Sequence, residues 1–390
     1  MKKPLRIAIY SGTIPSTTFI ERLIVGLSNK EQKVLLFGIS TRAARYSQFV
    51  SVICYKSNRF SKAIHLLKYT LLLLLFNIKE KRILDALLQS QNRSTWNDKL
   101  KTYPVLYHKP DVFHIQWAKG LNDWVWVQDF GMKLVLSLRG AHINYSPIAD
   151  LELAVMYRQN FPKVDGFHAV CQEIAIEAVK YGAKKETIHV VKSGLNLQEL
   201  AFKLKEFDSN TPLNIISVGR DHWIKDYRLA LDAMYILKQK GIFFRYNIIG
   251  VSENEGLVFQ RAQLGLENEV HFIDSMTFNA VQEAMNQADV FFLPSLKEGI
   301  ANVVLEAMAL GTIVVSSDCG GMAEVVKPND TGFLVPVRDV ESMTLALVAV
   351  SQLSKEDYQE MTKRARRFVE QNHSEEQMVE GMLDLYQGLG

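Results

Sequence analysis

Short apolar runs alternate with segments of helical length along the whole chain, and this alternation starts twice. The first series of runs occupies residues 5–10, 34–39, 112–116, 133–138, 166–170 and 188–191. The second occupies residues 214–218, 245–249, 270–273, 290–293, 313–316 and 332–335. Such alternation is typical of parallel strands joined by helices that cover both faces of a sheet. Each series is long enough for one doubly wound α/β domain, so we expect two such domains in the 390 residues.

The boundary between the two predicted domains is expected near residues 197–212. Residues 198–210 are polar and rich in charge, and Pro212 comes directly before the second series. Near the end of the chain, residues 355–371 and 374–389 have the pattern of two amphipathic helices, with Ser354 as a suitable N-cap for the first. We therefore predict domains at residues 1–200 and 201–370, followed by a C-terminal helix at 371–390.

The cysteines and the N-terminus both favour a cytoplasmic protein. Cys54, Cys171 and Cys319 are far apart and form no Cys-x-x-Cys pair, which argues against a disulfide framework or a zinc site. The apolar run at residues 7–10 is too short for the core of a signal peptide, and we interpret it as a buried strand. No metal and no other cofactor is expected.

Positive charge is concentrated at the front of the chain. Residues 1–109 contain 19 Lys or Arg and only 5 Asp or Glu, although the net charge of the whole protein is +3. A basic region of this kind indicates an anionic surface as a partner. No nucleic-acid motif accompanies the charge, so the pattern favours an anionic membrane over nucleic acid.

The most apolar stretch, residues 69–78, includes five consecutive leucines at 71–75 and has basic residues on both sides. It permits three interpretations: a buried helix of the first domain, a helix that lies in the membrane interface, or a membrane span. About ten apolar residues are half the length that a span needs. A helix with basic flanks is typical of the interface.

A turn followed by a helix is predicted at residues 294–311. The run Pro-Ser-Leu-Lys-Glu-Gly follows an apolar strand, and Gly311 would end the helix. The N-terminus of a helix presents backbone N–H groups that can bind phosphate or sugar oxygens. Glu298 in the turn and Glu306 in the helix can each accept two sugar hydroxyls, although single glutamates near a helix start are more often structural.

A second polar segment, residues 217–227, begins the back domain. It follows a strand, at the edge where open parallel sheets bind ligands. Arg220 and Lys225 are two cations that can neutralise a diphosphate, or else two solvated surface charges.

These motifs resemble those of retaining GT-B glycosyltransferases of family 4. Residues 294–311 match every fixed position of Pro-Ser-x-x-Glu-Gly-x-x-Asn-x-x-x-Glu-Ala-Met-Ala-x-Gly, and residues 219–226 resemble Gly-Arg-x4-Lys-Gly, with Asp226 in place of the second glycine. The resemblance implies two Rossmann-like domains that face each other across a cleft, an N-terminal acceptor domain, a C-terminal nucleotide-sugar domain and a final helix that returns to the first.

The same resemblance implies the roles of the donor residues. Glu306 would bind the ribose, and Arg220 and Lys225 the diphosphate. Glu298 would hold the donor sugar and phosphates with the backbone of Gly299, Ile300, Ala301, Asn302 and Val303. We also place Gly12 at the donor phosphates and Ser275 near the base.

Resemblance is weaker in the front domain, where we expect the acceptor. Thr17 takes the place of a glutamate in a Ser-Glu-Thr-Phe-Ile motif, and His114 lies in an Asp-Val-x-His strand. Arg139 and His142 occupy the two outer positions of a His-Gly-x-Asp motif, which other relatives carry as Arg-Gly-x-Asp. All four residues are predicted on the acceptor side. His142 is also grouped with Arg220, Lys225 and Glu298 as catalytic.

The sequence thus predicts a retaining, metal-independent glycosyltransferase that uses a nucleotide-sugar donor. The acceptor would be a saccharide or a lipid-linked sugar, in the synthesis of cell-surface polysaccharide or glycolipid. The predicted location is the cytoplasm, with peripheral attachment to the inner face of the membrane. The alternatives are a sugar-nucleotide epimerase on the same fold and a nucleotide-sugar-binding protein without turnover.

Overall fold

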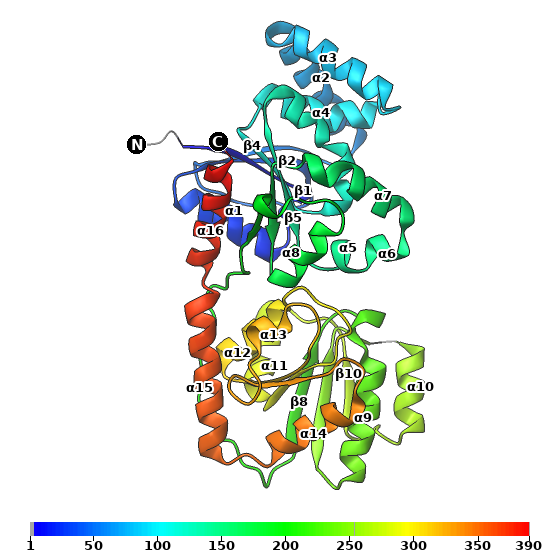
Figure 1. Cartoon of the computed structure of the whole chain (residues 1–390), viewed down its shortest axis with the longest axis vertical. Coiled ribbons are helices and arrows are strands. Elements are labelled where there is room, and N and C mark those ends of the chain that lie inside the picture. Colours follow the sequence, from blue (N-terminus) through cyan, green and yellow to red (C-terminus); the bar gives the residue numbers. More distant parts are fainter. Residues whose placement is uncertain (1–3, 253, 390) are drawn as a thin grey trace.

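The computed structural model describes residues 4–252 and 254–389, which form two α/β domains (Figure 1). Within these residues the front domain contains a seven-stranded parallel sheet in the order β3-β2-β1-β4-β5-β6-β7. Its strands are β1 (Arg6–Ile14), β2 (Lys33–Ser40), β3 (Val50–Tyr55), β4 (Val112–Ile115), β5 (Lys133–Leu138), β6 (Gly166–Ala169) and β7 (Ile188–Val190). Its α-helices are α1 (Thr18–Asn29), α2 (Arg59–Phe76), α3 (Ile78–Ser90), α4 (Trp96–His108), α5 (Ala141–Asn144), α6 (Ser146–Ala149), α7 (Leu151–Asn160) and α8 (Gln172–Val179).

The back domain contains a six-stranded parallel sheet in the order β10-β9-β8-β11-β12-β13. Its strands are β8 (Leu213–Val218), β9 (Phe244–Ile249), β10 (Val270–Ile273), β11 (Val290–Leu293), β12 (Ile313–Ser317) and β13 (Phe333–Val335). Its α-helices are α9 (Tyr227–Gln239), α10 (Glu255–Gln263), α11 (Phe278–Gln287), α12 (Asn302–Leu310), α13 (Met322–Val325), α14 (Val340–Ser351) and α15 (Lys355–Asn372). The last helix, α16 (Glu375–Gly388), lies on the front domain.

Both predicted series of strands are present, with two differences in the front domain. β3 was not predicted, although residues 52–55 are apolar. It is an edge strand whose Ser51 and Val52 are exposed. β1 does not end at Tyr10, as predicted. It continues to Ile14 through a bulge between Ile9 and Gly12.

The chain passes between the two domains twice. After β7 it enters the back domain, and at the end of α15 it returns, where Leu195 and Ser374 form an isolated parallel bridge. Met382 and Tyr386 of α16 then pack in the same core as Ile20 of α1. The final helix is therefore part of the front domain's core.

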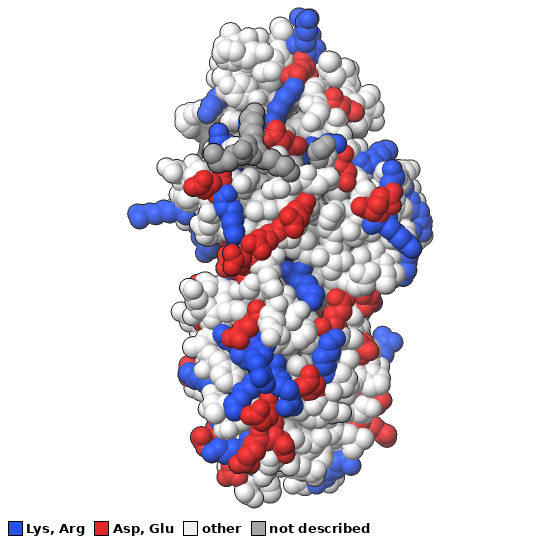
Figure 2. Space-filling view, turned by 60° about the vertical axis from the view of Figure 1, so that its left-hand side comes forward, with Lys and Arg blue, Asp and Glu red and all other residues white. Residues whose placement is uncertain are grey.

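Charge helps to hold α16 in place. The helix contains only acidic charges, and Lys30 of α1 lies 3.2 Å from Glu376 and 3.3 Å from Glu380. On the face of the molecule drawn in Figure 2, acidic side chains are grouped near the middle and basic side chains are grouped below them. Part of the positive charge of residues 1–109 thus faces α16 within the same molecule.

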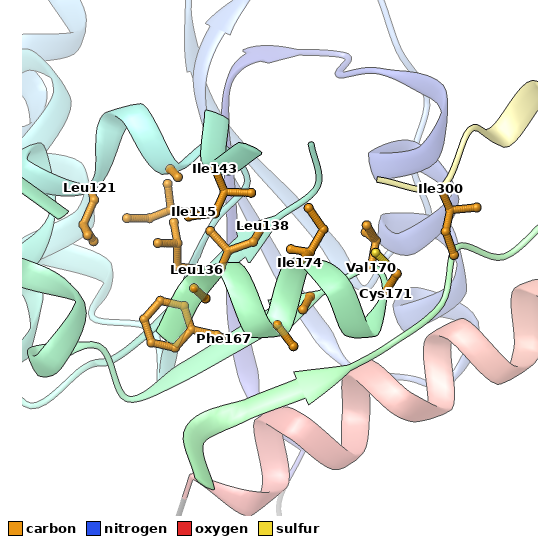
Figure 3. Packing of buried hydrophobic residues seen from close by; sticks show 14 of the residues in the cluster. Ile115, Leu121, Leu136, Leu138, Ile143, Phe167, Val170, Cys171, Ile174 and Ile300 are labelled. Carbon is orange, nitrogen blue, oxygen red and sulfur yellow. The ribbon is translucent and has the colours of Figure 1, made fainter. Parts of the chain in front are cut away.

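The two domains share an apolar contact. A single cluster of buried residues includes Leu138, Val170 and Cys171 of the front domain and Ile300 and Val304 of the back domain. In Figure 3 Ile300 lies next to Val170 and Cys171, at the end of the front domain's core. The cluster holds the strand ends of one sheet close to those of the other.

The leucine run is not a buried helix, so that interpretation is wrong. It forms the second half of α2, where Leu73 is 0% exposed but Leu71 and Leu74 are 51% and 44% exposed. α2 packs on α4 and β3 with the side that carries His65, Tyr69 and Leu73. The opposite side is therefore apolar and exposed. No helix in the described part of the chain has the length and hydropathy that a membrane span requires.

Candidate active site

A cavity of about 370 Å³ lies between the carboxyl ends of the two sheets. The front domain contributes side chains that follow β4 and β5, and the back domain contributes the loops after β8 and β11. The lining side chains with polar or aromatic groups are Phe19, Gln116, Trp117, Ser137, Arg139, His142, Ser193, Arg220, Glu298 and Asn302. In open parallel sheets this edge is where ligands bind.

Arg220 and Lys225 lie on one loop, between β8 and α9. Arg220 is exposed at the cavity, and it has no ion pair with any residue that the structure describes. Lys225 Nζ lies 2.7 Å from Glu298 Oε1, and both side chains are largely buried. The structure thus brings together Arg220, Lys225 and Glu298, which are far apart in the sequence.

Asp226, which stands where the resembled motif has a glycine, adopts a backbone conformation that favours glycine. It has φ 48° and ψ 44°, in the left-handed region, between the 3-10 turn Trp223–Lys225 and α9. An L-residue in this region is strained by about 1–2 kcal/mol, less for Asp than for most residues. The aspartate adds a carboxyl group to this loop, and burial raises its pKa.

The turn before α12 packs directly on the front domain. A Cβ atom at Gly299 would lie 2.0 Å from the Arg139 carbonyl oxygen, so no other residue fits there. Asn144 Nδ2 donates a hydrogen bond of 3.0 Å to the Glu298 carbonyl oxygen. The glycine is thus required by a contact between domains, a reason that the sequence did not indicate.

The predicted donor residues around this turn have different surroundings. Ile300 and Asn302 line the cavity, and Asn302 Oδ1 is buried without a hydrogen-bond partner in the described residues. Ala301 is buried, and Val303 packs against the shared apolar cluster. α12 ends at Gly311, as predicted, with φ 88°.

Glu306 of α12 is not among the residues that line the cavity, and its side chain faces Arg22 of the front domain. Its side chain is buried, and its Oε1 lies 4.0 Å from Nη2 of Arg22 on α1. Burial raises the pKa of Glu306 to about 7, and Arg22 opposes this shift. Arg22 Nη1 also donates to the carbonyl oxygen of Gly194, the neighbour of the cavity residue Ser193, at 3.4 Å. Glu306 therefore contacts α1 of the front domain, whereas Glu298 pairs with Lys225 of the back domain.

Arg139 and His142 form the front wall of the cavity. The His142 ring makes an edge contact with Trp117, with ring centroids 5.6 Å apart. Burial, assisted by the nearby Lys119, lowers the pKa of His142, which favours a neutral imidazole at pH 7. Arg139 follows β5 directly, and its guanidinium lies over the Phe19 ring at 4.5 Å.

His114 does not reach the cavity, which corrects its predicted place on the acceptor side. It is fully buried, and its two ring nitrogens lie 2.7 Å from Tyr386 Oη and 2.8 Å from Ser137 Oγ. His168, also buried, continues this network at 2.8 Å from Ser137 Oγ. His114 therefore connects α16 to the sheet behind the site.

Several further predicted residues are not among the cavity's lining: Lys225, Gly299, Ala301, Val303 and Glu306, and three residues elsewhere. Gly12 lies in the bulge of β1, and Thr17 is the exposed N-cap residue of α1. Ser275 is exposed in the loop after β10. Within the described chain, no group of three or more His, Cys, Asp or Glu side chains has the geometry of a metal site.

Sequence reasoning missed several cavity residues. Gln116 and Trp117 follow β4, a position that could have been recognised because neighbouring parallel strands end at the same edge. Phe19 comes from α1, and Ser193 from the first connection between domains. Their presence depends on how the domains pack.

Comparison with known proteins identifies the back half of this site. The sequence pattern of the family described as glycosyl transferases group 1 matches residues 201–368. We call the matched residues, 201–368, the group 1 domain. The group 1 domain includes Arg220, Lys225, Glu298 and Glu306, and the front domain lies outside the match.

Relatives and solved structures agree with this assignment. WcaL of Escherichia coli (strain K12), named for colanic acid biosynthesis, is 32% identical over 60% of this chain and 59% of its own. AmsK, the amylovoran biosynthesis glycosyltransferase of Erwinia amylovora, is 34% identical over 45% of this chain and 44% of its own. The chain thus spans about half the length of these relatives. HepE of Anabaena, in complex with UDP and glucose, has a TM-score of 0.71 at 14% identity, and the match covers 98% of this chain and 100% of that one. The architecture is therefore the GT-B fold.

Proposed function

We propose that the protein is a retaining glycosyltransferase that transfers a sugar from a nucleotide-sugar donor to a saccharide acceptor. The observation that carries the proposal is that one cavity is lined by Arg220 and Glu298 of the group 1 domain and by Arg139 and His142 of the front domain. The relatives WcaL and AmsK are named for polysaccharide biosynthesis, and this chain is proposed to act in a similar process.

In the proposed reaction, an acceptor hydroxyl attacks the anomeric carbon on the face from which the diphosphate departs. The bond from that carbon to the phosphate oxygen breaks, and the acceptor proton passes to the departing phosphate. Arg220 and Lys225 stabilise the negative charge that develops on the leaving group, so no metal ion is required. Lys225 Nζ lies 2.7 Å from Oε1 of Glu298. The other carboxylate oxygen of Glu298 is proposed to position the donor sugar.

Glu306 is proposed to accept the ribose hydroxyls, and the neutral His142 is proposed to contact the acceptor or the donor sugar. The N-terminus of α12 supplies partial positive charge towards the phosphates. The nucleotide-sugar is a substrate in this scheme, and no cofactor is proposed.

The test begins with thermal unfolding of the protein in the presence of UDP-, GDP- and ADP-sugars. A ligand at 100 times its dissociation constant adds about 2.7 kcal/mol of stability. The stabilising donor is then incubated with acceptors, and the anomeric configuration of the product is determined by NMR. Conversion of the donor without acceptor would instead support an epimerase, and binding without any conversion a non-catalytic protein.

We further propose that the front domain attaches to an anionic membrane through α2 and the start of α3. Exposed apolar side chains follow one side of α2 at intervals of three or four residues: Phe60, Ile64, Leu67, Leu71 and Leu74. This spacing places them on one helical face, away from the core. We call these five residues the apolar stripe.

Basic side chains flank the apolar stripe. Arg59, Lys68, Lys79 and Arg82 are exposed, and they form no ion pair with the described residues. Each Lys or Arg near an anionic surface contributes about 1 kcal/mol to binding. An apolar face with basic flanks fits the interface of an anionic bilayer better than a protein surface of neutral charge.

Figure 1 shows α2 and α3 at the end of the front domain that is opposite the back domain. Attachment there would hold the cavity away from the bilayer. The proposed acceptor is therefore a lipid-linked saccharide of several sugars, whose reacting end extends from the inner face of the cytoplasmic membrane.

Co-sedimentation with vesicles tests this attachment. The protein is expected to sediment with phosphatidylglycerol vesicles at low salt and much less with phosphatidylcholine vesicles. Leu71→Glu combined with Leu74→Glu should abolish binding, because it places two charges in the apolar stripe. Phe259→Glu, at an exposed apolar position on α10, is the matched control. Equal binding by the stripe variant, or no binding by the wild type at low salt, would refute the attachment.

A further inference from the structure

The front wall of the cavity holds a positive charge that no carboxylate of the described chain neutralises. Arg139 Nη2 donates hydrogen bonds to Gln116 Oε1 at 2.6 Å and to Ser137 Oγ at 3.2 Å, and both acceptors are neutral. Arg139 forms no ion pair with a described residue. In the back wall, by contrast, Lys225 is paired with Glu298.

Much of the guanidinium's hydrogen-bonding capacity is unused. It carries five N–H donors, and Nε is buried without a partner in the described part of the chain. Its flat face lies over the Phe19 ring, so the Phe19 side offers no hydrogen-bond acceptor. A buried charge without a partner costs free energy. The unpaired guanidinium of Arg139 is therefore suited to bind an anionic group of a ligand.

The groups behind Arg139 supply no negative charge at neutral pH. Gln116 Nε2 lies 3.1 Å from His114 Nδ1, and Ser137 Oγ lies 2.8 Å from rings of both His114 and His168. Burial lowers the pKa of both histidines, so they remain neutral. Burial also lowers the pKa of Arg139 to about 10, which still leaves it charged at pH 7. This neutral network holds the guanidinium in place towards the cavity.

We propose that Arg139 binds an acidic substituent, a carboxylate or a phosphate, on one of the two saccharide substrates. The inference rests on the proposed glycosyltransferase function, in which Arg220 and Lys225 already bind the donor diphosphate. Arg139 is on the opposite wall of the same cavity and is not needed for that diphosphate. Trp117 and His142 beside it provide flat surfaces against which a sugar ring can pack.

The acidic group can belong to either substrate, and calorimetry distinguishes the two sources. The donor arm compares UDP-glucose with UDP-glucuronate, and GDP-mannose with GDP-mannuronate, because each pair differs only at carbon 6. The acceptor arm compares methyl glucoside, methyl glucuronide and glucose 6-phosphate in the presence of a saturating nucleoside diphosphate. A charge-assisted hydrogen bond of this kind predicts that one acidic probe binds roughly 10- to 100-fold tighter than its neutral counterpart.

Arg139→Gln should remove this preference, because glutamine retains hydrogen-bond donors but not the charge. Arg139→Lys should retain part of it. Arg158→Gln on α7 is the matched control, since Arg158 is exposed and lies over the Tyr181 ring at 5.8 Å, away from the cavity. This control should keep the full preference.

The outcomes separate this inference from the proposed function. If the wild type binds a nucleoside diphosphate but favours no acidic probe, Arg139 is not an anion site and the proposed function stands. A preference that persists in Arg139→Gln overturns the inference in the same way. Failure of the wild type to bind any of UDP, GDP or ADP refutes the proposed function itself. Unchanged diphosphate binding by Arg139→Gln shows that a lost preference is not due to unfolding.

Discussion

The two walls of the cavity are built on different electrostatic principles. On the back-domain side, Lys225 lies 2.7 Å from Glu298, and Glu306 lies 4.0 Å from Arg22 of the front domain, whereas the lining residue Arg220 has no ion pair with a described residue. In the front wall, Arg139 is supported only by neutral amide, hydroxyl and imidazole groups. Lys225 and Glu306 can therefore exchange these ion pairs for the diphosphate and the ribose, groups that many nucleotide-sugar donors share. The front wall favours one charge sign and so selects among substrates.

The largest effect is expected from the cations of the back wall. Arg220→Ala and Lys225→Ala should each slow transfer by roughly 10²–10³-fold, since each removes a preorganised charge that stabilises the leaving diphosphate. The measurement is turnover with the donor that the stability screen identifies. Lys240→Ala, at an exposed lysine just beyond α9, should leave turnover unchanged. Near-normal turnover in both back-wall variants would mean that the proposed mechanism is wrong.

The two glutamates of the back wall should differ in what they bind. Glu306→Ala should weaken nucleoside diphosphate binding roughly 10- to 100-fold, because the ribose loses a charged hydrogen-bond acceptor. Glu298→Ala should weaken nucleotide-sugar binding more than diphosphate binding, because the diphosphate lacks the sugar. Calorimetry with both ligands measures this. Equal losses for both ligands in both variants would contradict the division.

The pH dependence of nucleotide-sugar binding should show the ionisation of Glu306. Its pKa of about 7 means that the carboxylate is mostly protonated at pH 6 and mostly ionised at pH 8. If only the ionised form accepts the ribose hydroxyls, nucleotide-sugar affinity should rise by about tenfold from pH 6 to pH 8 and then level off. Glu306→Gln does not titrate, so its profile should be flat over this range. If the wild-type profile is as flat as that of Glu306→Gln, the ionisation of Glu306 does not control nucleotide-sugar affinity, and this prediction is wrong.

The smallest effect concerns the loop that carries Lys225. Asp226→Gly should stabilise the protein by about 1 kcal/mol, because glycine adopts the left-handed backbone without strain. For a domain of this size, that shifts the melting temperature by about 2–4 °C. Asp226→Ala is the control, since it removes the carboxylate and keeps the strain. An equal gain in both variants would assign the effect to charge instead.

Local pattern was enough to predict most of the secondary structure. β5, β10 and β11 have the bounds that their apolar runs indicated, and Ser354 caps α15 through a hydrogen bond from Asp357 N. These features depend on neighbouring residues in the chain, so the sequence determines them directly. β3, at the edge of the sheet, was not predicted, although residues 52–55 form an apolar run.

The tertiary structure decided which residues share a cavity and which side of α2 is exposed. Phe19 lines the cavity and Arg22 contacts Glu306 because α1 lies beside the interdomain contact. His114 instead is buried against Tyr386 of α16. Leu73 and Leu74 are neighbours in a run of identical residues, yet one is fully buried and the other is not. By itself, the sequence determined the two α/β series and the residues that carry charge at the strand ends. Packing alone decided their partners, because contacts between distant segments depend on the whole arrangement of sheets and helices, which no local pattern encodes.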